Sequence, residues 1–233
     1  MDTQSSPGGD PFAVVLGAGP GVGAAFARQL GRRGYRVALV ARDAGRLSAL
    51  AEQVRAGGID VRTATADAAD GDGLAAVVDE LAKGAGRLDV LHYNPSRFRA
   101  GGVRDVTPQD LLDDLALGAV GLLAAVRGGL EHLLVRGGTV VATGGGAADR
   151  AMPGGLTLPV EKGALRSLVI ALAAELLPQG IHVATVTVRG TIKPGTPFAP
   201  DVVAAALAGL VEETAGPRES WRTVVDLTRD GLR

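Results

Sequence analysis

The sequence predicts a single α/β domain built on a doubly wound parallel sheet of seven strands, with helices on both faces. Short apolar segments alternate with longer segments of helical periodicity, an order typical of parallel sheets. The apolar segments carry almost no polar residues, as expected for strands that are covered on both faces. The chain has 233 residues, which suits one large domain at about 150 residues per domain.

The elements are expected in strict alternation. The strands are expected at 12–16, 35–41, 59–65, 88–93, 139–143, 181–188 and 221–227, and the helices at 22–33, 44–56, 73–83, 108–136, 158–177 and 201–213. Four of these helices end just before glycine, at Gly34, 57–58, 137–138 and Gly180, because glycine adopts the left-handed conformation that stops a helix. Right-handed crossovers would place helices on both faces of the sheet. In such a doubly wound sheet, a ligand is expected at the carboxyl ends of the strands.

Composition narrows the range of functions. The net charge of −1 gives no general attraction to nucleic acid, and no apolar run approaches the roughly 20 residues that span a membrane. Residues 1–10 are polar and rich in glycine and proline, so we expect a flexible tail before a domain at 11–233, with no secretion signal. The chain has no cysteine, its three histidines lack metal-ligand spacing, and a cytoplasmic location is the default.

A glycine-rich turn links the first strand to the first helix. It runs from Gly17 through Gly19 and Gly21 to Val22 and Gly23. Glycine permits the tight backbone, and missing side chains let a pyrophosphate approach the free N–H groups at the helix N-terminus. The context therefore predicts a dinucleotide site, although a merely tight turn is the simpler reading. No Gly-Lys-Ser/Thr follows, which excludes a Walker loop.

The end of the second strand distinguishes the two nicotinamide dinucleotides. A site for NAD(H) favours a carboxylate there, which accepts from the ribose 2′-hydroxyl. This chain has Arg42 instead, whose guanidinium suits a 2′-phosphate, so NADP(H) is preferred over NAD(H). Asp43 follows and weakens this preference, unless it begins the next helix. Arg42 is otherwise an ordinary exposed residue.

Over residues 12–228 the sequence resembles the short-chain dehydrogenase/reductase family, which has a Rossmann fold. The glycine turn resembles the family's cofactor turn, Asp67 its acidic residue beside adenine, and Asn94 the first residue of its Asn-Ala-Gly segment. Lys162 resembles the lysine of the Tyr-x-x-x-Lys helix. Residues 189–192 resemble the segment that closes over nicotinamide, which gives Gly190 and Ile192 a cofactor role. The resemblance implies a homodimer or homotetramer.

The departures from the family pattern are at the positions of its catalytic residues. Leu158 stands where the family has its tyrosine, Gly145 where it has its serine, and Ala116 where it has its asparagine. A leucine cannot transfer a proton, and general acid–base help contributes about 10²–10⁴ in rate. Of the usual four catalytic groups only Lys162 remains.

Other groups near the expected reaction site are weaker candidates for a catalytic or substrate-binding role. Thr143 is a possible substitute acid, and Gly144 to Gly146 offer N–H groups for an oxyanion. Tyr93 and Ser96, with Gly144, Gly145 and Leu158, are expected at the substrate pocket. Each has a simpler interpretation, Thr143 as an ordinary strand residue and Tyr93 as a ring in the core or the pocket wall.

Four further side chains have mainly structural interpretations. His92 is expected to be packed in the core, and Glu161 to be solvated on the exposed side of its helix turn. Arg97 and Arg99 follow the fourth strand, where they could meet an anionic substrate or lie solvated in a loop.

Three functions follow from these features. The first is an atypical NADP(H)-dependent oxidoreductase acting on a small carbonyl or alcohol. The second is a non-redox enzyme in the same pocket, such as a cyclase, lyase or isomerase. The third is a nucleotide-sensing protein without catalysis. The retained cofactor elements favour the first, and the lost tetrad favours the other two.

Overall fold

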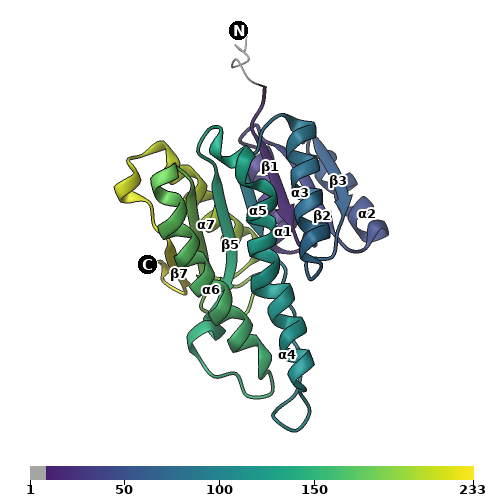
Figure 1. Cartoon of the computed structure of the whole chain (residues 1–233), viewed down its shortest axis with the longest axis vertical. Coiled ribbons are helices and arrows are strands. Elements are labelled where there is room, and N and C mark those ends of the chain that lie inside the picture. The colour runs from purple at the N-terminus through teal and green to yellow at the C-terminus, as the bar shows by residue number, and fades with distance from the viewer. Residues whose placement is uncertain (1–8) are drawn as a thin grey trace.

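The sheet dominates the architecture (Figure 1). The computed structural model describes residues 9–233. Within them, eight strands are ordered β3-β2-β1-β4-β5-β6-β7-β8. Their bounds are β1 Phe12–Leu16, β2 Arg36–Ala41, β3 Val61–Thr65, β4 Val90–Tyr93, β5 Thr139–Gly145, β6 His182–Val188, β7 Val224–Thr228 and β8 Gly231–Leu232. β1 to β7 pair in parallel, as the sequence predicts, and the order reverses between β1 and β4.

Seven α-helices occur within the described residues. Their bounds are α1 Val22–Gly31, α2 Ala44–Arg55, α3 Gly71–Ala85, α4 Pro108–Leu115, α5 Gly121–Leu134, α6 Thr157–Leu176 and α7 Pro200–Glu212. Figure 1 looks onto the face covered by α3, α5 and α6, while α1, α2 and α7 cover the other face. Successive strand residues point to opposite faces, so Ala13 and Val15 join one core while Phe12 and Val14 join the other.

Two expectations about the elements need correction. The sheet has an eighth strand, because the chain turns back after β7 and Leu232 pairs antiparallel with Leu227. The single helix expected at 108–136 is interrupted by a π-helical turn at Ala116–Val120. At its centre, a Cβ on Gly118 would lie 2.1 Å from Glu161 Cγ on α6, so only glycine permits this close approach. Such π turns often occur at functional sites.

The expected tail lies mostly outside the described residues, since these begin at Gly9. Gly9 and Asp10 are held by the domain, because their carbonyls accept from Arg87 and Arg36. Among residues 9–233, every helix is too short or too polar to cross a membrane.

Candidate functional site

A cleft lies along the carboxyl ends of the strands, where the reversal of strand order leaves a crevice. It consists of two adjoining cavities. The β2-side cavity has a volume of about 560 Å³ and lies between α2, the end of β2 and the residues after β3. The β5-side cavity has about 390 Å³ and lies between β5, α6 and the segment after β6. Gly19, Asn94 and Ser96 line both cavities, so the cleft is continuous.

The glycine turn forms the floor where the cavities meet. Gly17 has a φ of +70°, and a Cβ there would lie 2.7 Å from Pro95 N, so no other residue fits. A Cβ on Gly19 or Gly21 would have nothing within 4 Å, because both face the open cleft. Asn94 Nδ2 donates to Gly17 O at 3.0 Å and fixes the turn against β4.

The amino end of α1 faces this floor. Gly21 caps the helix without a side-chain hydrogen bond, and the first turn carries no acidic residue. Val22 and Gly23 begin the helix, and a Cβ on Gly23 would lie 3.0 Å from Ala18 Cα. The helix dipole therefore presents its positive end to the cleft without a built-in anion.

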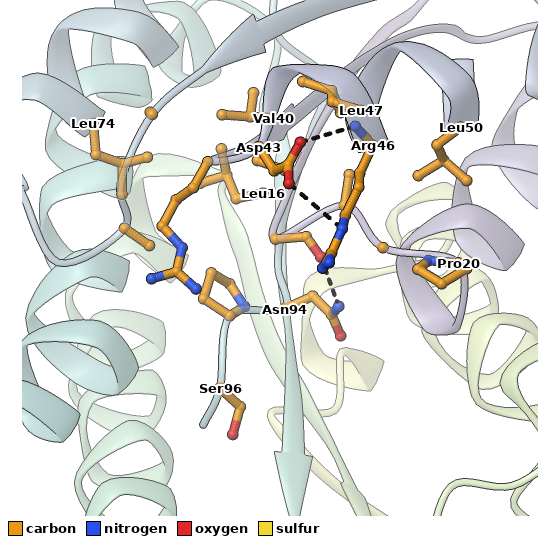
Figure 2. Close-up of a pocket in the computed structure, with 18 of the residues that line it drawn as sticks. Leu16, Pro20, Val40, Asp43, Arg46, Leu47, Leu50, Leu74, Asn94 and Ser96 are labelled. Atoms are coloured by element: carbon orange, nitrogen blue, oxygen red, sulfur yellow. Dashed lines mark hydrogen bonds and ion pairs between the residues drawn. The ribbon is translucent and has the colours of Figure 1, made fainter. Parts of the chain in front are cut away.

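Two arginines stand at the far end of the β2-side cavity. Arg42 and Arg46 both line it, and Arg42 is exposed without a hydrogen-bond or ion-pair partner among residues 9–233. Asp43 is the N-cap of α2, since its Oδ1 accepts from Arg46 N at 2.9 Å, and its other oxygen lies 3.4 Å from Arg46 Nε (Figure 2). Asp43 therefore serves the helix, which leaves Arg42 available to a ligand.

Asp67 lies at the rim of the β2-side cavity. Its neighbours Ala66 and Ala68 line the cavity, whereas Asp67 is exposed and its Oδ1 accepts from Ala69 N at 3.0 Å. A role for Asp67 beside adenine stays a prediction.

The β5-side cavity is mostly apolar. Many of the expected site residues line it: Gly19, Gly21, Val22, Gly23, Asn94, Ser96, Thr143, Gly144, Gly145, Leu158, Lys162, Gly190 and Ile192. Gly190 is confined, because a Cβ there would lie 2.1 Å from the ring of Phe198. Gly145 has room, because a Cβ would make only an ordinary contact, 3.7 Å from Lys162 Cγ.

Neither of the chain's two tyrosines lines this cavity. Tyr93, which we expected at the substrate pocket, is instead buried in the core beneath α3 and α5, where its hydroxyl donates to Leu117 O. Burial raises the pKa of Tyr93, and the charges of Glu161 and Asp67 raise it further. Tyr35 packs against the core on the opposite face of the sheet.

The side chain of Thr143 is hydrogen-bonded to a buried histidine. Its hydroxyl lies 3.0 Å from His92 Nε2, and the His92 ring packs against Phe26 with centroids 4.5 Å apart. Complete burial lowers the pKa of His92 to about 3, so the ring is neutral at physiological pH. The packed role expected for His92 is confirmed.

Glu161 is the main surprise of the site, because the expected solvated side chain is fully buried. Its Oε1 accepts from Ser96 Oγ at 2.9 Å and lies 3.4 Å from Lys162 Nζ. Lys162 Nζ also donates to Thr143 O at 3.3 Å. Burial lowers the pKa of Lys162, and the neighbouring Glu161 offsets part of this effect.

Arg97 and Arg99 are held by the protein itself. Arg99 Nε and a terminal nitrogen each donate at 3.0 Å to the fully buried Asp114, and Arg97 lies 3.5 Å from the same carboxylate. Burial alone would raise the pKa of Asp114, but the bonds and charges of these arginines outweigh it and lower the pKa. Arg99 is therefore neither solvated nor available to an anionic substrate.

The rim of the β5-side cavity combines two loops, at the bottom of Figure 1. The loop after β4 and the loop before α6 are joined by an isolated parallel bridge between Gly101 and Gly155. Gly101 N donates to Gly154 O at 3.0 Å, and Leu156 N donates to Gly101 O at 3.3 Å.

The helical spacing of the apolar residues could have predicted that Glu161 is buried. Glu161 shares one face of α6 with the buried residues Leu165, Val169, Leu172 and Leu176. This i, i+4 repeat places position 161 on the buried face, whatever its residue type.

Comparisons with known proteins agree with this geometry. The family pattern described as short chain dehydrogenase matches residues 11–201. An uncharacterized oxidoreductase of Methylorubrum extorquens is 30% identical over 203 residues, which cover 87% of this chain and 82% of that protein. Versicolorin reductase of Emericella nidulans is 29% identical over 182 residues, which cover 78% and 69%.

A solved structure extends the likeness to the fold. The crystal structure of a short chain dehydrogenase from Burkholderia cenocepacia J2315 in complex with NADP superposes with a TM-score of 0.83 at 30% identity. The match covers 94% of this chain and 96% of the other. With the family pattern spanning the sheet from β1 to the start of α7, the chain belongs to the short-chain dehydrogenase/reductase family of oxidoreductases.

Proposed function

We propose that this protein binds NADP(H) and acts as an oxidoreductase on a small carbonyl or alcohol, with an atypical catalytic centre. The continuous cleft from the glycine turn to Lys162 carries the proposal. When bound, the dinucleotide would supply or accept the hydride.

The residues present fit that cofactor. Gly19 and Gly21 leave space for phosphates above the positive end of α1. The β2-side cavity would hold the adenosine, while Lys162, Gly190 and Ile192 would hold the nicotinamide riboside in the other.

The preference for NADP(H) rests on Arg42 and Arg46, which would pair with a 2′-phosphate. The NADP in the related Burkholderia structure supports it.

The catalytic centre is proposed to lack the family's usual pair, with Leu158 in place of the phenol and Gly145 in place of the serine. Lys162 would bind ribose hydroxyls, and Thr143 would contact the substrate through its hydroxyl. We also propose a cytoplasmic homodimer or homotetramer. The exposed apolar residues Leu112 on α4 and Leu123 on α5 support the association.

Calorimetric titration with NADPH and NADH tests the cofactor. We expect Arg42→Ala to raise the Kd for NADPH about tenfold, since charged hydrogen bonds contribute about 1.5–3 kcal/mol, and to leave NADH binding unchanged. Arg32→Ala, at the exposed end of α1, is the matched control. Equal Kd values for both dinucleotides would contradict the preference.

Leu158 and Gly145 favour two alternatives on the same scaffold, a nucleotide-sensing protein and a non-redox enzyme. Absorbance assays of NADPH oxidation against a panel of small ketones and aldehydes distinguish these from an oxidoreductase. Tight NADPH binding without oxidation of NADPH by any member of the panel would support the two alternatives.

A further inference from the structure

The structure contains one buried ionic cluster that opens onto the cleft. Ser96 is exposed at the junction of the two cavities, at the end of the view in Figure 2 opposite Asp43 and Arg46. Behind it, Glu161 is fully buried and Lys162 nearly so. Ser96 Oγ, Glu161 Oε1 and Lys162 Nζ form a continuous chain with separations of 2.9 and 3.4 Å.

The cluster is unlike the other ionic groups around the cleft. Asp114 is also fully buried, but Arg99 bonds to both of its oxygens. Glu161 Oε2, by contrast, has no hydrogen-bond partner among residues 9–233. A buried carboxylate without full pairing carries a large desolvation penalty, so the arrangement is poorly explained by stability alone.

The surrounding backbone is shaped around this carboxylate. The π turn brings Gly118 so close to Glu161 that no larger residue fits. α4 and the π turn both pack against α6, and the approach of Gly118 occurs at the Glu161 side chain. This geometry fixes the carboxylate next to Ser96, while leaving the serine hydroxyl in the cleft.

We propose that Ser96, Glu161 and Lys162 form a proton-delivery chain to a ligand oxygen in the β5-side cavity. Ser96 would touch the ligand as the catalytic hydroxyl, Glu161 would pass the proton, and Lys162 would share it. The inference rests on the proposed oxidoreductase function, in which a carbonyl oxygen must gain a proton as its carbon gains a hydride.

The proton path balances without any further reactant. The Glu161–Lys162 pair holds one transferable proton, either on Nζ or on the carboxyl group. When the pair's proton lies on the Glu161 carboxyl group, that group donates to Ser96 Oγ, and the Ser96 hydroxyl turns from Glu161 to the ligand. As the ligand oxygen takes the Ser96 hydroxyl proton, Ser96 Oγ takes the proton of the Glu161 carboxyl group. Glu161 is left as a carboxylate beside a neutral Lys162 amine, and cleft water restores the proton through Ser96 after the product leaves.

Two other hydroxyl groups nearby are already engaged, since Thr143 Oγ1 is bonded to His92 and Tyr93 donates to Leu117 O. Neither is bonded to a buried acid. Thr157 Oγ1 is buried without a hydrogen-bond partner among residues 9–233, but Thr157 lines neither cavity. Ser96 is therefore the hydroxyl that joins the cleft to a proton reservoir.

The activity test uses Ser96→Ala and Glu161→Gln in the intact protein. We expect each to lower kcat for NADPH-dependent carbonyl reduction at least ~100-fold, as loss of general acid help does. The double variant should be no slower than the slower single one, because both residues serve one path. Glu175→Gln, an exposed position on the same helix, should change kcat less than about twofold.

The pH profile distinguishes proton delivery from a structural role. The wild-type kcat should fall as pH rises and the pair loses its proton, and Glu161→Gln should abolish that limb. Tyr93, at the end of β4, interacts electrostatically with Glu161. On α4, which packs against α6, Asp114 is paired with Arg97 and Arg99 from the loop after β4. Additive losses in the double variant, or an unchanged pH limb in Glu161→Gln, would overturn the proposal.

A measurement without cofactor keeps the inference separate from the proposed function. In protein labelled with ¹³C at glutamate carboxyl groups, the resonance lost in Glu161→Gln identifies this carboxyl group. Its chemical shift should change in Ser96→Ala and stay in Glu175→Gln. An unchanged chemical shift in Ser96→Ala overturns the chain. A changed chemical shift in a protein that oxidises no NADPH instead refutes the oxidoreductase function and leaves the coupling of Ser96 to Glu161 standing.

Discussion

The two cavities of the cleft differ in how their surfaces are built. The glycine floor of the β2-side cavity is fixed by backbone geometry, with Gly17 wedged against Pro95 and Asn94 tied to Gly17 O. The β5-side cavity depends on side chains that project from a finished scaffold, such as Leu158 and Lys162. The proposed dinucleotide site and the proposed reaction site are thus built by different parts of the sequence.

This separation has a physical reason. A change at Gly17 disturbs the strand–helix turn, whereas a change at Gly145 meets only the flexible stem of Lys162. Residues at positions such as Gly145, which contact only flexible side chains, can be exchanged while the sheet and the glycine turn stay intact. The family fold can therefore persist around an altered reaction centre.

The largest effect is expected from restoring the family's serine and tyrosine at positions 145 and 158. This change tests whether the β5-side cavity can be altered without affecting the glycine turn. In a Ser96→Ala background, which removes the proposed proton-delivery chain, we expect Gly145→Ser with Leu158→Tyr to raise kcat for carbonyl reduction by about 10²–10⁴, because a phenol beside Lys162 becomes a general acid. NADPH affinity, measured by calorimetry, should change less than about threefold, since the glycine floor is untouched.

The matched control is Gly145→Ser with Leu158→Phe, which supplies the ring without the hydroxyl. A similar gain in this control would show that cavity shape, and not proton transfer, limits the reaction.

A substitution at Gly17 tests the β2-side cavity, whose glycine floor is fixed by backbone geometry. Gly17→Ala should raise the Kd for NADPH more than ~10-fold and lower the free energy of unfolding by roughly 1–3 kcal/mol, because φ is +70° and the new Cβ meets Pro95. Gly58→Ala is the matched control, with a φ of +78° and nothing within 4 Å of its Cβ. It should lose stability only, as followed by urea unfolding. Equal losses of NADPH affinity in both variants would contradict a specific role for the turn.

The smallest expected effect concerns His92 behind Thr143. Its pKa in the folded protein is lowered to about 3 by burial, whereas an unfolded histidine protonates near pH 6.5. Between these values the unfolded state binds the extra proton, so stability is complete above about pH 6.5 and falls as pH is lowered. The slope should reach up to about 1.4 kcal/mol per pH unit.

Urea unfolding between about pH 5 and 7 measures this slope, above the range where Asp114 and Asp149, whose pKa values are lowered, gain protons. The slope should shrink in His92→Gln and persist in His132→Gln, a partly exposed control. An identical slope in wild type and His92→Gln would refute a neutral buried His92.

Most of the fold could be predicted because its signals are local. Apolar strands, helical periodicity and terminal glycines give the alternation from β1 to β7. The π turn at 116–120 could not be predicted, because it depends on the contact between Gly118 and Glu161, which are distant in sequence. The β8 strand is too short for a pattern.

The cleft could be predicted in outline and not in its ionic contacts. Its lining follows from the ends of the strands, so Thr143, Gly145 and Lys162 were expected there. The pairing of Ser96 with Glu161 and of Arg99 with Asp114 joins a loop to a helix, which residue types alone do not specify. Tyr93 was misplaced because strand ends present side chains alternately to the two faces.

The bridge between Gly101 and Gly155 has a practical consequence for redesign. Since the two rim segments share backbone hydrogen bonds, exchanging one of them for a foreign sequence would leave the other with unmatched donors and acceptors. Residues 94–107 and 150–156 are therefore best transplanted together, as a single cassette.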